Sequence, residues 1–328
     1  MGMVVGLASA LTGATFLESR ALARWGRNSS PDGPPSGSGG GARPELRGKS
    51  RVVTTDDGAR LAVTRFGPSD APKVVVMAHG FTGRSVHWEP ITRRLVDAGL
   101  SVVVYDQRGH GESTVGAEGF TMGVLGDDLA AVLRAEAPEG AVVVGHSMGG
   151  VSIQVLFAQH PSLASKVASI VLVASLARSG GSPLGHAIGR LAGTRLARRA
   201  MGHPRHGKVL VRSGFGAAPA LDQLDVVRSG WANCPDETRR GFARALSHFD
   251  LSTTLPTIEV PALVICGDQD QVTPLEESQR MAELLPQGRL EVARGAGHEV
   301  TLERPDWVAM LIRSMTDPSL AVVDLRER

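Results

Sequence analysis

Residues 145–149 read GHSMG and follow the apolar run Val142–Val144. After residue 150 the apolar residues recur at helical spacing, so the pattern predicts a strand that turns sharply into a helix. Glycines without Cβ atoms let the strand and helix approach closely around Ser147. The turn would expose the Ser147 hydroxyl at the carboxyl end of the strand, above the N–H groups of the helix. A serine hydroxyl in this position can act as a nucleophile. The five-residue motif by itself is equally compatible with an incidental serine in a glycine-rich turn.

A nucleophilic serine needs a base, and the sequence offers one. Residues 79–83 (HGFTG), 267–274 (GDQDQVTP) and 295–299 (GAGHE) each follow an apolar strand pattern, and the last contains His298. A histidine can accept the serine proton and later return it to the leaving group, provided that a carboxylate orients its ring. Asp268 and Asp270 compete for that orienting role. The simpler interpretation of His298 is a histidine in a surface loop.

Short apolar runs, mostly β-branched, alternate with helical patterns along the chain. A hairpin is predicted first, and six further strands follow it: Arg51–Thr55 and Leu61–Phe66, then Val74–Ala78, Val102–Tyr105, Val142–Val144, Ile170–Val173, Leu263–Cys266 and Leu290–Ala293. This alternation predicts an α/β fold whose eight-stranded, mostly parallel sheet has helices on both faces. The carboxyl ends of parallel strands gather the polar segments at one edge.

The alternation stops between the sixth and seventh strands, where a helical cap is expected over the strand ends. The predicted organisation is therefore a core of residues 50–175 and 259–318, a cap or lid of residues 176–258, and a separate segment of residues 1–49. That segment holds an apolar stretch, residues 3–17, and a Gly/Ser/Pro-rich linker. The stretch lacks a basic flank before it and is short for a membrane span. A cytoplasmic protein is expected, with membrane association through residues 3–17 as the alternative.

Composition excludes several classes of protein. The 328 residues are 42% hydrophobic and 21% charged, which is ordinary for a globular protein. A net charge of +2 and 4% aromatic residues argue against a nucleic-acid partner. Cys234 and Cys266 do not make a disulfide framework or a metal cluster, and no metal site is expected. The sequence makes no prediction of the oligomeric state.

From about residue 51 to 316 the chain resembles the α/β-hydrolase fold superfamily, and within it the esterase, lipase and haloperoxidase-like branch with a serine nucleophile. HGFTG, GHSMGG, GDQDQVTP and GAGH carry the resemblance, in the chain order Ser, Asp, His. It implies a catalytic triad of Ser147, Asp270 and His298, because the family's acid lies three residues after the strand-end glycine. It also implies an oxyanion hole formed by the backbone N–H groups of Phe81 and Met148.

The expected activity is cofactor-independent hydrolysis of carboxylic esters through an acyl-enzyme, on a small-molecule or lipid-like substrate. Perhydrolase, thioesterase and C–C hydrolase activities use the same triad and stay open, as does a non-catalytic, membrane-tethered binding protein. Residues 106–111 (DQRGHG) are interpreted as a structural turn held by internal polar contacts. His146 is expected to point away from the nucleophile.

The cap sequence is strongly basic over residues 176–221, which contain no acidic residue. The basic residues are Arg178, Arg190, Arg195, Arg198, Arg199, Arg205, Lys208 and Arg212. A solvated helix face explains them most simply. The functional alternative is contact with an anionic membrane surface or an acidic substrate.

Overall fold

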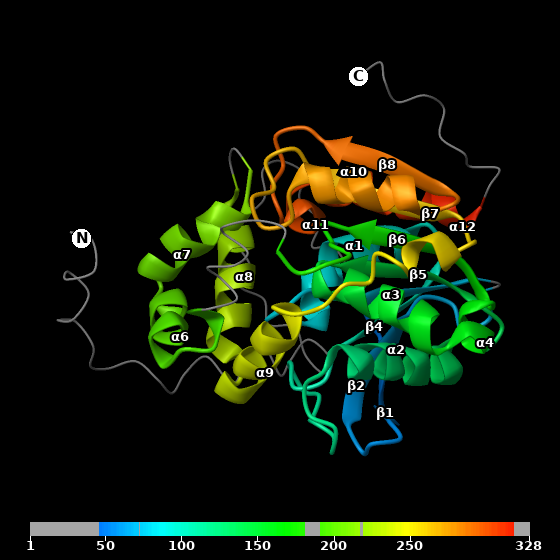
Figure 1. Cartoon of the computed structure of the whole chain (residues 1–328), viewed down its shortest axis with the longest axis horizontal. Coiled ribbons are helices and arrows are strands. Elements are labelled where there is room, and N and C mark those ends of the chain that lie inside the picture. Colours follow the sequence, from blue (N-terminus) through cyan, green and yellow to red (C-terminus); the bar gives the residue numbers. More distant parts are fainter. Residues whose placement is uncertain (1–45, 72, 181–190, 217–218, 318–328) are drawn as a thin grey trace. The chain divides into compact units, whose positions relative to one another are not determined.

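The β-branched runs form one eight-stranded sheet in the order β1-β2-β4-β3-β5-β6-β7-β8 in the computed structural model (Figure 1). The strands are β1 (Lys49–Thr54), β2 (Arg60–Phe66), β3 (Val74–Ala78), β4 (Ser101–Tyr105), β5 (Ala141–His146), β6 (Val167–Val173), β7 (Ala262–Gly267) and β8 (Gly288–Ala293). Only the pairs β1–β2 and β2–β4 are antiparallel. Every residue of β3, β4 and β5 is buried, as expected for central parallel strands covered on both faces.

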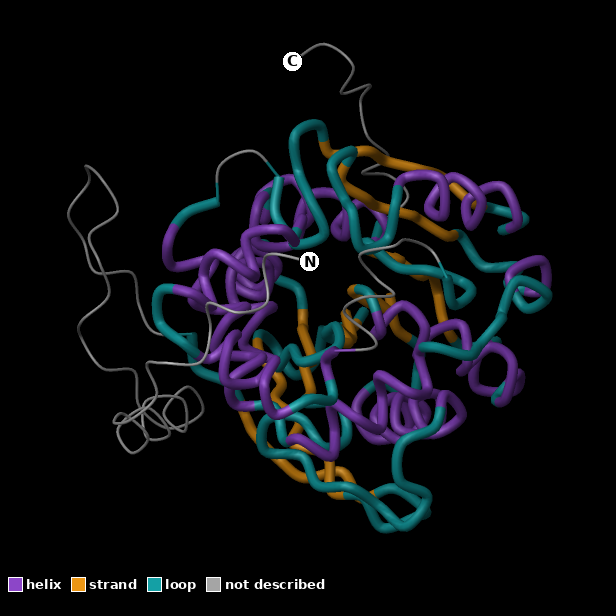
Figure 2. Tube along the Cα trace, turned by 60° about the vertical axis from the view of Figure 1, so that its left-hand side comes forward, coloured by secondary structure: helices purple, strands orange, loops and turns teal. Residues whose placement is uncertain are grey.

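Helices (purple in Figure 2) flank the strands (orange). The core helices are α1 (Glu89–Asp97), α2 (Met122–Glu136), α3 (Met148–Gln159), α4 (Pro161–Ala164), α10 (Leu275–Leu284), α11 (Val300–Glu303) and α12 (Pro305–Thr316), with 3-10 turns η1 (Ser85–Trp88) and η3 (Leu255–Thr257). α1 packs on α12, whereas α2 packs on α3 and shares an apolar core with it and α10. The predicted fold class is confirmed.

Among the described residues, four helices and two 3-10 turns, η2 and η3, lie between β6 and β7, where the cap was expected (Figure 1). These inserted helices are α6 (Arg195–Gly202), α7 (His206–Val211), α8 (Leu221–Asn233) and α9 (Asp236–Leu246), with η2 (Arg212–Gly214). α6, α7 and α8 pack on one another. The division into a core and a cap at the residues given above stays a prediction.

The structure describes residues 46–71, 73–180, 191–216 and 219–317. Residues 3–17, Arg190 and most of the predicted linker lie outside these ranges. Among the described helices, none has the length and apolar content needed to cross a bilayer.

Candidate active site

Ser147 occupies the sharp turn between β5 and α3. Its φ of 52° and ψ of −117° are strained for a residue with a side chain. The two glycines explain why the turn can form. A Cβ at position 145 would lie 2.3 Å from the Gly149 carbonyl oxygen, and one at position 149 would lie 2.1 Å from the Ala78 carbonyl oxygen. Because these contacts exclude any larger residue, the GHSMG spacing determines how closely α3 packs on β3 and β5.

His298 and Asp270 lie against each other at the carboxyl ends of β8 and β7. The distance from His298 Nδ1 to Asp270 Oδ2 is 2.9 Å, and Asp270 is fully buried. The backbone N–H groups of Val272 and Thr273 each donate to Asp270 Oδ1 at 2.8 Å. The Thr273 hydroxyl donates to Asp270 Oδ2 at 2.6 Å. The sequence analysis assigned no role to Thr273, although its position three residues after Asp270 could have suggested this turn.

Asp268, the other aspartate of this loop, has a structural role. Asp268 is exposed, and its Oδ1 accepts a hydrogen bond of 2.7 Å from the backbone N–H of Gly295. It therefore ties the loop after β7 to the loop that carries His298. Asp270, rather than Asp268, is the carboxylate beside the imidazole.

The electrostatics of this pair favour a charged imidazole. Burial lowers the pKa of His298, but the charge and hydrogen bond of Asp270, with Glu299 and Glu303 nearby, raise it above its ordinary value. Burial opposes the ionisation of Asp270, yet His298 and Thr273 hold its pKa below the ordinary value. Burial raises the pKa of Glu299 to about 7. An imidazolium that forms at His298 would therefore be stabilised by acidic neighbours.

His146 joins the segment of Ser147 to the loop of His298. Its Nε2–H donates to the His298 carbonyl oxygen at 2.9 Å, and the two rings lie 4.9 Å apart. Burial lowers the pKa of His146 to about 3, so the ring is neutral. Its side chain braces the histidine loop, a role that the sequence analysis did not propose. Among the described residues no hydrogen bond joins the Ser147 hydroxyl to the His298 ring, and such bonds often close only in the substrate complex.

The loop after β3 lies against the serine from the other side. A Cβ at position 80 would lie 3.2 Å from the Ser147 Cβ. The buried His79 ring supports this loop, with Nδ1 donating to the Gly80 carbonyl oxygen at 2.8 Å and Nε2 accepting from the Gln107 backbone at 2.9 Å. Burial keeps the pKa of His79 well below its ordinary value, so the ring is neutral, and these two hydrogen bonds fix its tautomer. Phe81 follows directly in this loop.

Apolar side chains surround the two predicted oxyanion residues. Met148 is buried with Leu125 and Phe242, and Phe81 packs on this group. The Phe81 ring also meets Trp231 of α8 edge to face, with ring centres 5.7 Å apart. Phe81 therefore contacts both the sheet side and the inserted helices.

The inserted helices touch the site loops through tight backbone contacts. A Cβ at Gly230 of α8 would lie 2.6 Å from the Thr82 carbonyl oxygen. The Glu303 carboxylate accepts 2.8 Å hydrogen bonds from the N–H groups of Gly216 and Gly297, so it links the loop after η2 to the loop of His298. The sequence analysis missed Gly230 and Glu303, because neither lies in a recognisable motif.

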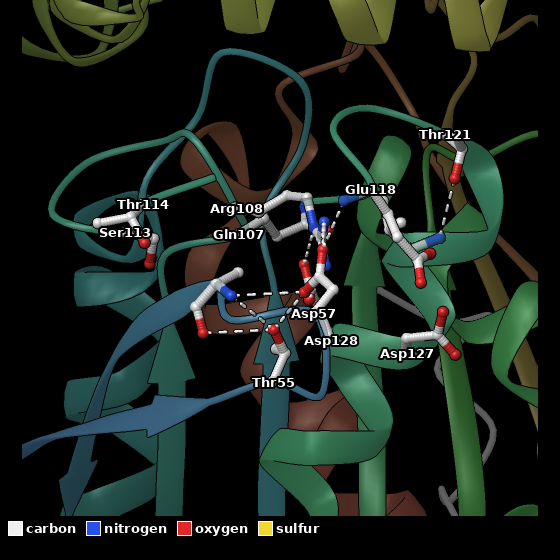
Figure 3. A network of polar contacts seen from close by, with 12 residues as sticks. Thr55, Asp57, Gln107, Arg108, Ser113, Thr114, Glu118, Thr121, Asp127 and Asp128 are labelled. Carbon is white, nitrogen blue, oxygen red and sulfur yellow. Dashed lines mark hydrogen bonds and ion pairs between the residues drawn. The ribbon is translucent and has the colours of Figure 1, made fainter. Parts of the chain in front are cut away.

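Residues 106–111 form a turn held by internal polar contacts, as predicted (Figure 3). Arg108 is 1% exposed and lies 2.8 Å from Asp57 Oδ2 and 2.6 Å from Asp128 Oδ1. Its hydrogen bonds with Asp57 help to hold the pKa of that carboxyl well below its usual range, although burial opposes ionisation. This cluster anchors the turn to the loop between β1 and β2 and to α2.

Residues 73–305 match the family model described as alpha/beta hydrolase fold. The chain belongs to this family. The predicted superfamily is thus confirmed, and the α/β-hydrolase architecture accounts for the convergence of the loops after β3, β5, β7 and β8.

Curated relatives and solved structures resemble this α/β-hydrolase over most of its length. A bifunctional esterase/perhydrolase of Acinetobacter calcoaceticus is 31% identical over 270 residues, which cover 75% of this chain and 92% of the relative. A non-heme chloroperoxidase of Burkholderia pyrrocinia is 29% identical over 75% of this chain and 92% of its own. An esterase structure from Exiguobacterium antarcticum aligns with a TM-score of 0.73 and 22% identity, covering 82% of this chain and all of the esterase, and supports the fold alone.

Proposed function

We propose that this α/β-hydrolase cleaves carboxylic esters, with Ser147 as nucleophile, His298 as general base and acid, and Asp270 as the orienting carboxylate. The observation that carries the proposal is the 2.9 Å contact of Asp270 Oδ2 with His298 Nδ1, in a loop tied through His146 to the strained serine turn. The esterase named among the relatives supports the same reaction class.

In this mechanism the Ser147 Oγ attacks the acyl carbon while His298 Nε2 takes the hydroxyl proton. Asp270 stabilises the imidazolium, and the backbone N–H groups of Met148 and Phe81 donate to the developing oxyanion. Collapse of the intermediate breaks the bond to the alcohol oxygen, which receives the proton from His298. Water then attacks the acyl-enzyme by the same steps in reverse and releases the acid.

The surroundings of the oxyanion residues favour an apolar acyl group. Phe81, Met148, Phe242 and Trp231 gather there from the core and from the inserted helices. A medium or long unbranched acyl chain would remove water from these side chains, at about 25 cal/mol per Å² of buried apolar area. The inserted helices would serve as the cap that excludes water from the acyl-enzyme.

Perhydrolase activity is the second candidate, because one relative is named a bifunctional esterase/perhydrolase. Hydrogen peroxide would replace water in attacking the same acyl-enzyme, giving a peroxy acid. Both activities need Ser147, so both should disappear together in a Ser147→Ala variant.

The first test measures hydrolysis rates for p-nitrophenyl esters and thioesters of increasing acyl length, and for a monoacylglycerol. The second test is covalent labelling of the protein with a fluorophosphonate. We expect labelling that is lost in Ser147→Ala, and ester hydrolysis that improves with acyl length. Thioesters cleaved faster than esters would move the assignment to a thioesterase. A wild-type protein that neither reacts with the fluorophosphonate nor cleaves any ester would instead be a binding protein.

A further inference from the structure

Exposed apolar side chains are concentrated in one part of the inserted helices. Among the described residues, six large apolar side chains are highly exposed: Val52, Leu191, Leu196, Val209, Leu210 and Leu221. All but Val52 lie between residues 191 and 221. Leu196 is 65% exposed and Val209 is 75% exposed. Scattered exposed leucines are ordinary, but a group of them indicates a contact surface.

Positive charge is interleaved with these apolar residues. The described residues 191–216 contain six basic side chains and no acidic one. Acidic residues of α8 and α9 neutralise part of this charge, since Lys208 pairs with Asp225 at 2.6 Å and Arg198 pairs with Asp236 at 2.9 Å. Arg199 and Arg205 are exposed, and neither forms an ion pair with another described residue. Their charge is available to an external partner.

The helices that carry these residues are not packed on the sheet. α6 and α7 contact α8 and each other, and they lie beyond α8 from the sheet (Figure 1). No side chain of α6 is buried. Leu196 and Arg199 of this helix are exposed and therefore do little for the stability of the fold, which leaves a contact role for them.

We propose that Leu191, Leu196, Arg199, Arg205, Val209 and Leu210, together called the α6–α7 surface, bind the surface of an anionic membrane. Arginines attract anionic headgroups, and the leucine and valine side chains enter the boundary between headgroups and acyl chains. A polyanion such as a nucleic acid would use the arginines but would gain little from the apolar residues. The combination favours a lipid surface. The proposal goes beyond ester hydrolysis and does not depend on it.

The experiment is co-sedimentation of the full chain, carrying Ser147→Ala, with vesicles of phosphatidylcholine alone or mixed with phosphatidylglycerol. This background keeps lipid binding separate from any hydrolysis. We expect binding to the mixed vesicles that weakens as salt is added, because surface charges are screened. The double variant Arg199→Gln/Arg205→Gln should bind about 25-fold more weakly, from roughly a fivefold contribution per arginine at the surface.

The double variant Leu196→Ser/Val209→Ser should also bind more weakly while keeping its preference for anionic vesicles. Arg134→Gln/Arg313→Gln is the matched control, because these exposed arginines lie on α2 and α12. It should bind like the parent. All the substituted side chains are exposed, so thermal unfolding should be unchanged.

Equal binding of the parent and both α6–α7 variants would overturn the proposal, even if the chain binds vesicles through another segment. Binding to zwitterionic vesicles as tight as to anionic ones would overturn it as well. Equally tight binding of polyglutamate, unaffected by the serine substitutions, would replace the membrane with a soluble polyanion.

Discussion

Two buried ionic clusters lie near the carboxyl ends of the sheet, and they differ in what they can do. Arg108 sits between Asp57 and Asp128, with contacts of 2.8 and 2.6 Å. His298 sits against Asp270 at 2.9 Å. Burial and short carboxylate contacts are common to both, so these features alone do not identify a catalytic site.

The two clusters differ in whether the cationic side chain can exchange a proton, and in whether one of its nitrogens is left without a hydrogen bond to the described residues. Arg108 is permanently charged, and its three guanidinium nitrogens all donate, to Asp57, Asp128 and the Gly119 carbonyl. His298 can gain and lose a proton, Asp270 raises its pKa, and its Nε2 makes no hydrogen bond with another described residue. The first cluster can only hold elements together, whereas the second can move a proton.

The largest predicted effect separates the two aspartates of the loop after β7. Asp270→Asn should lower kcat/KM by about 10⁴-fold, because the imidazole loses its orientation and its counter-charge. Asp268→Asn is the matched control, since among the described residues its carboxylate accepts a hydrogen bond only from the Gly295 backbone, and its turnover should change little. Steady-state kinetics on one p-nitrophenyl ester distinguish them. Equal and mild losses in both variants would show that Asp270 is not the triad acid.

The complementary substitution should damage stability rather than chemistry. Arg108→Met leaves two buried carboxylates without their partner, which should lower the free energy of unfolding by about 3–5 kcal/mol. Denaturant unfolding measures this loss, and kcat per folded molecule should stay close to that of the parent. Arg93→Met, in an i,i+4 pair with Glu89 on α1, should cost only about 0.5 kcal/mol. Similar costs for both would mean that the buried cluster does not anchor its turn.

A smaller effect is expected where α8 meets the loop of Phe81. Gly230→Ala would push against the Thr82 carbonyl oxygen, now 2.6 Å from the new Cβ, and would displace a predicted oxyanion donor. Loss of one such donor costs about 10²–10³-fold in kcat, and partial displacement should cost about 10–100-fold with little change in KM. Gly202→Ala is the control, because its Cβ would meet Ala232 at an ordinary 3.4 Å. Unchanged kcat in Gly230→Ala would remove α8 from the positioning of this loop.

The smallest effect concerns pH, where only the histidine cluster should respond. The reaction needs neutral His298, whose pKa is raised, so the rate should fall with acid through a pKa above 6.5. Burial raises the pKa of Glu299 to about 7, and the negative charge of the ionised carboxylate helps to raise the pKa of His298. In Glu299→Gln the acid limb of kcat/KM should therefore move to lower pH.

Glu283→Gln, at an exposed position on α10, is the control for that shift and should leave the limb in place. An acid limb that does not move in Glu299→Gln would mean that this carboxylate does not act on His298.

The described part of the fold could be predicted from the sequence because its signals are local. Valine runs such as Val142–Val144 indicate strands covered on both faces, and helical spacing after Gly150 indicates α3. The glycines around Ser147 predict the tight turn because no larger residue fits beside the Ala78 carbonyl. The order of the polar motifs follows from the alternation of strands and helices.

The partners of individual side chains could not be predicted, because they depend on distances between segments that are far apart in the sequence. Asp268 and Asp270 have the same chemistry, and only the packing of the loops after β7 and β8 turns Asp270 toward the imidazole. The hydrogen bond between Glu303 and Gly216 and the close approach of Gly230 to Thr82 join segments more than 80 residues apart in the chain.

The basic segment, residues 176–221, also separates what the sequence determines from what the tertiary structure decides. The sequence by itself determined that residues 176–221 carry positive charge without any acidic residue. Tertiary structure decided that Arg198 and Lys208 meet carboxylates from α9 and α8, while Arg199 and Arg205 stay exposed beside Leu196 and Val209. Composition and periodicity are properties of neighbours in the chain, whereas charge pairing acts over a few ångströms and is decided only when distant segments fold together.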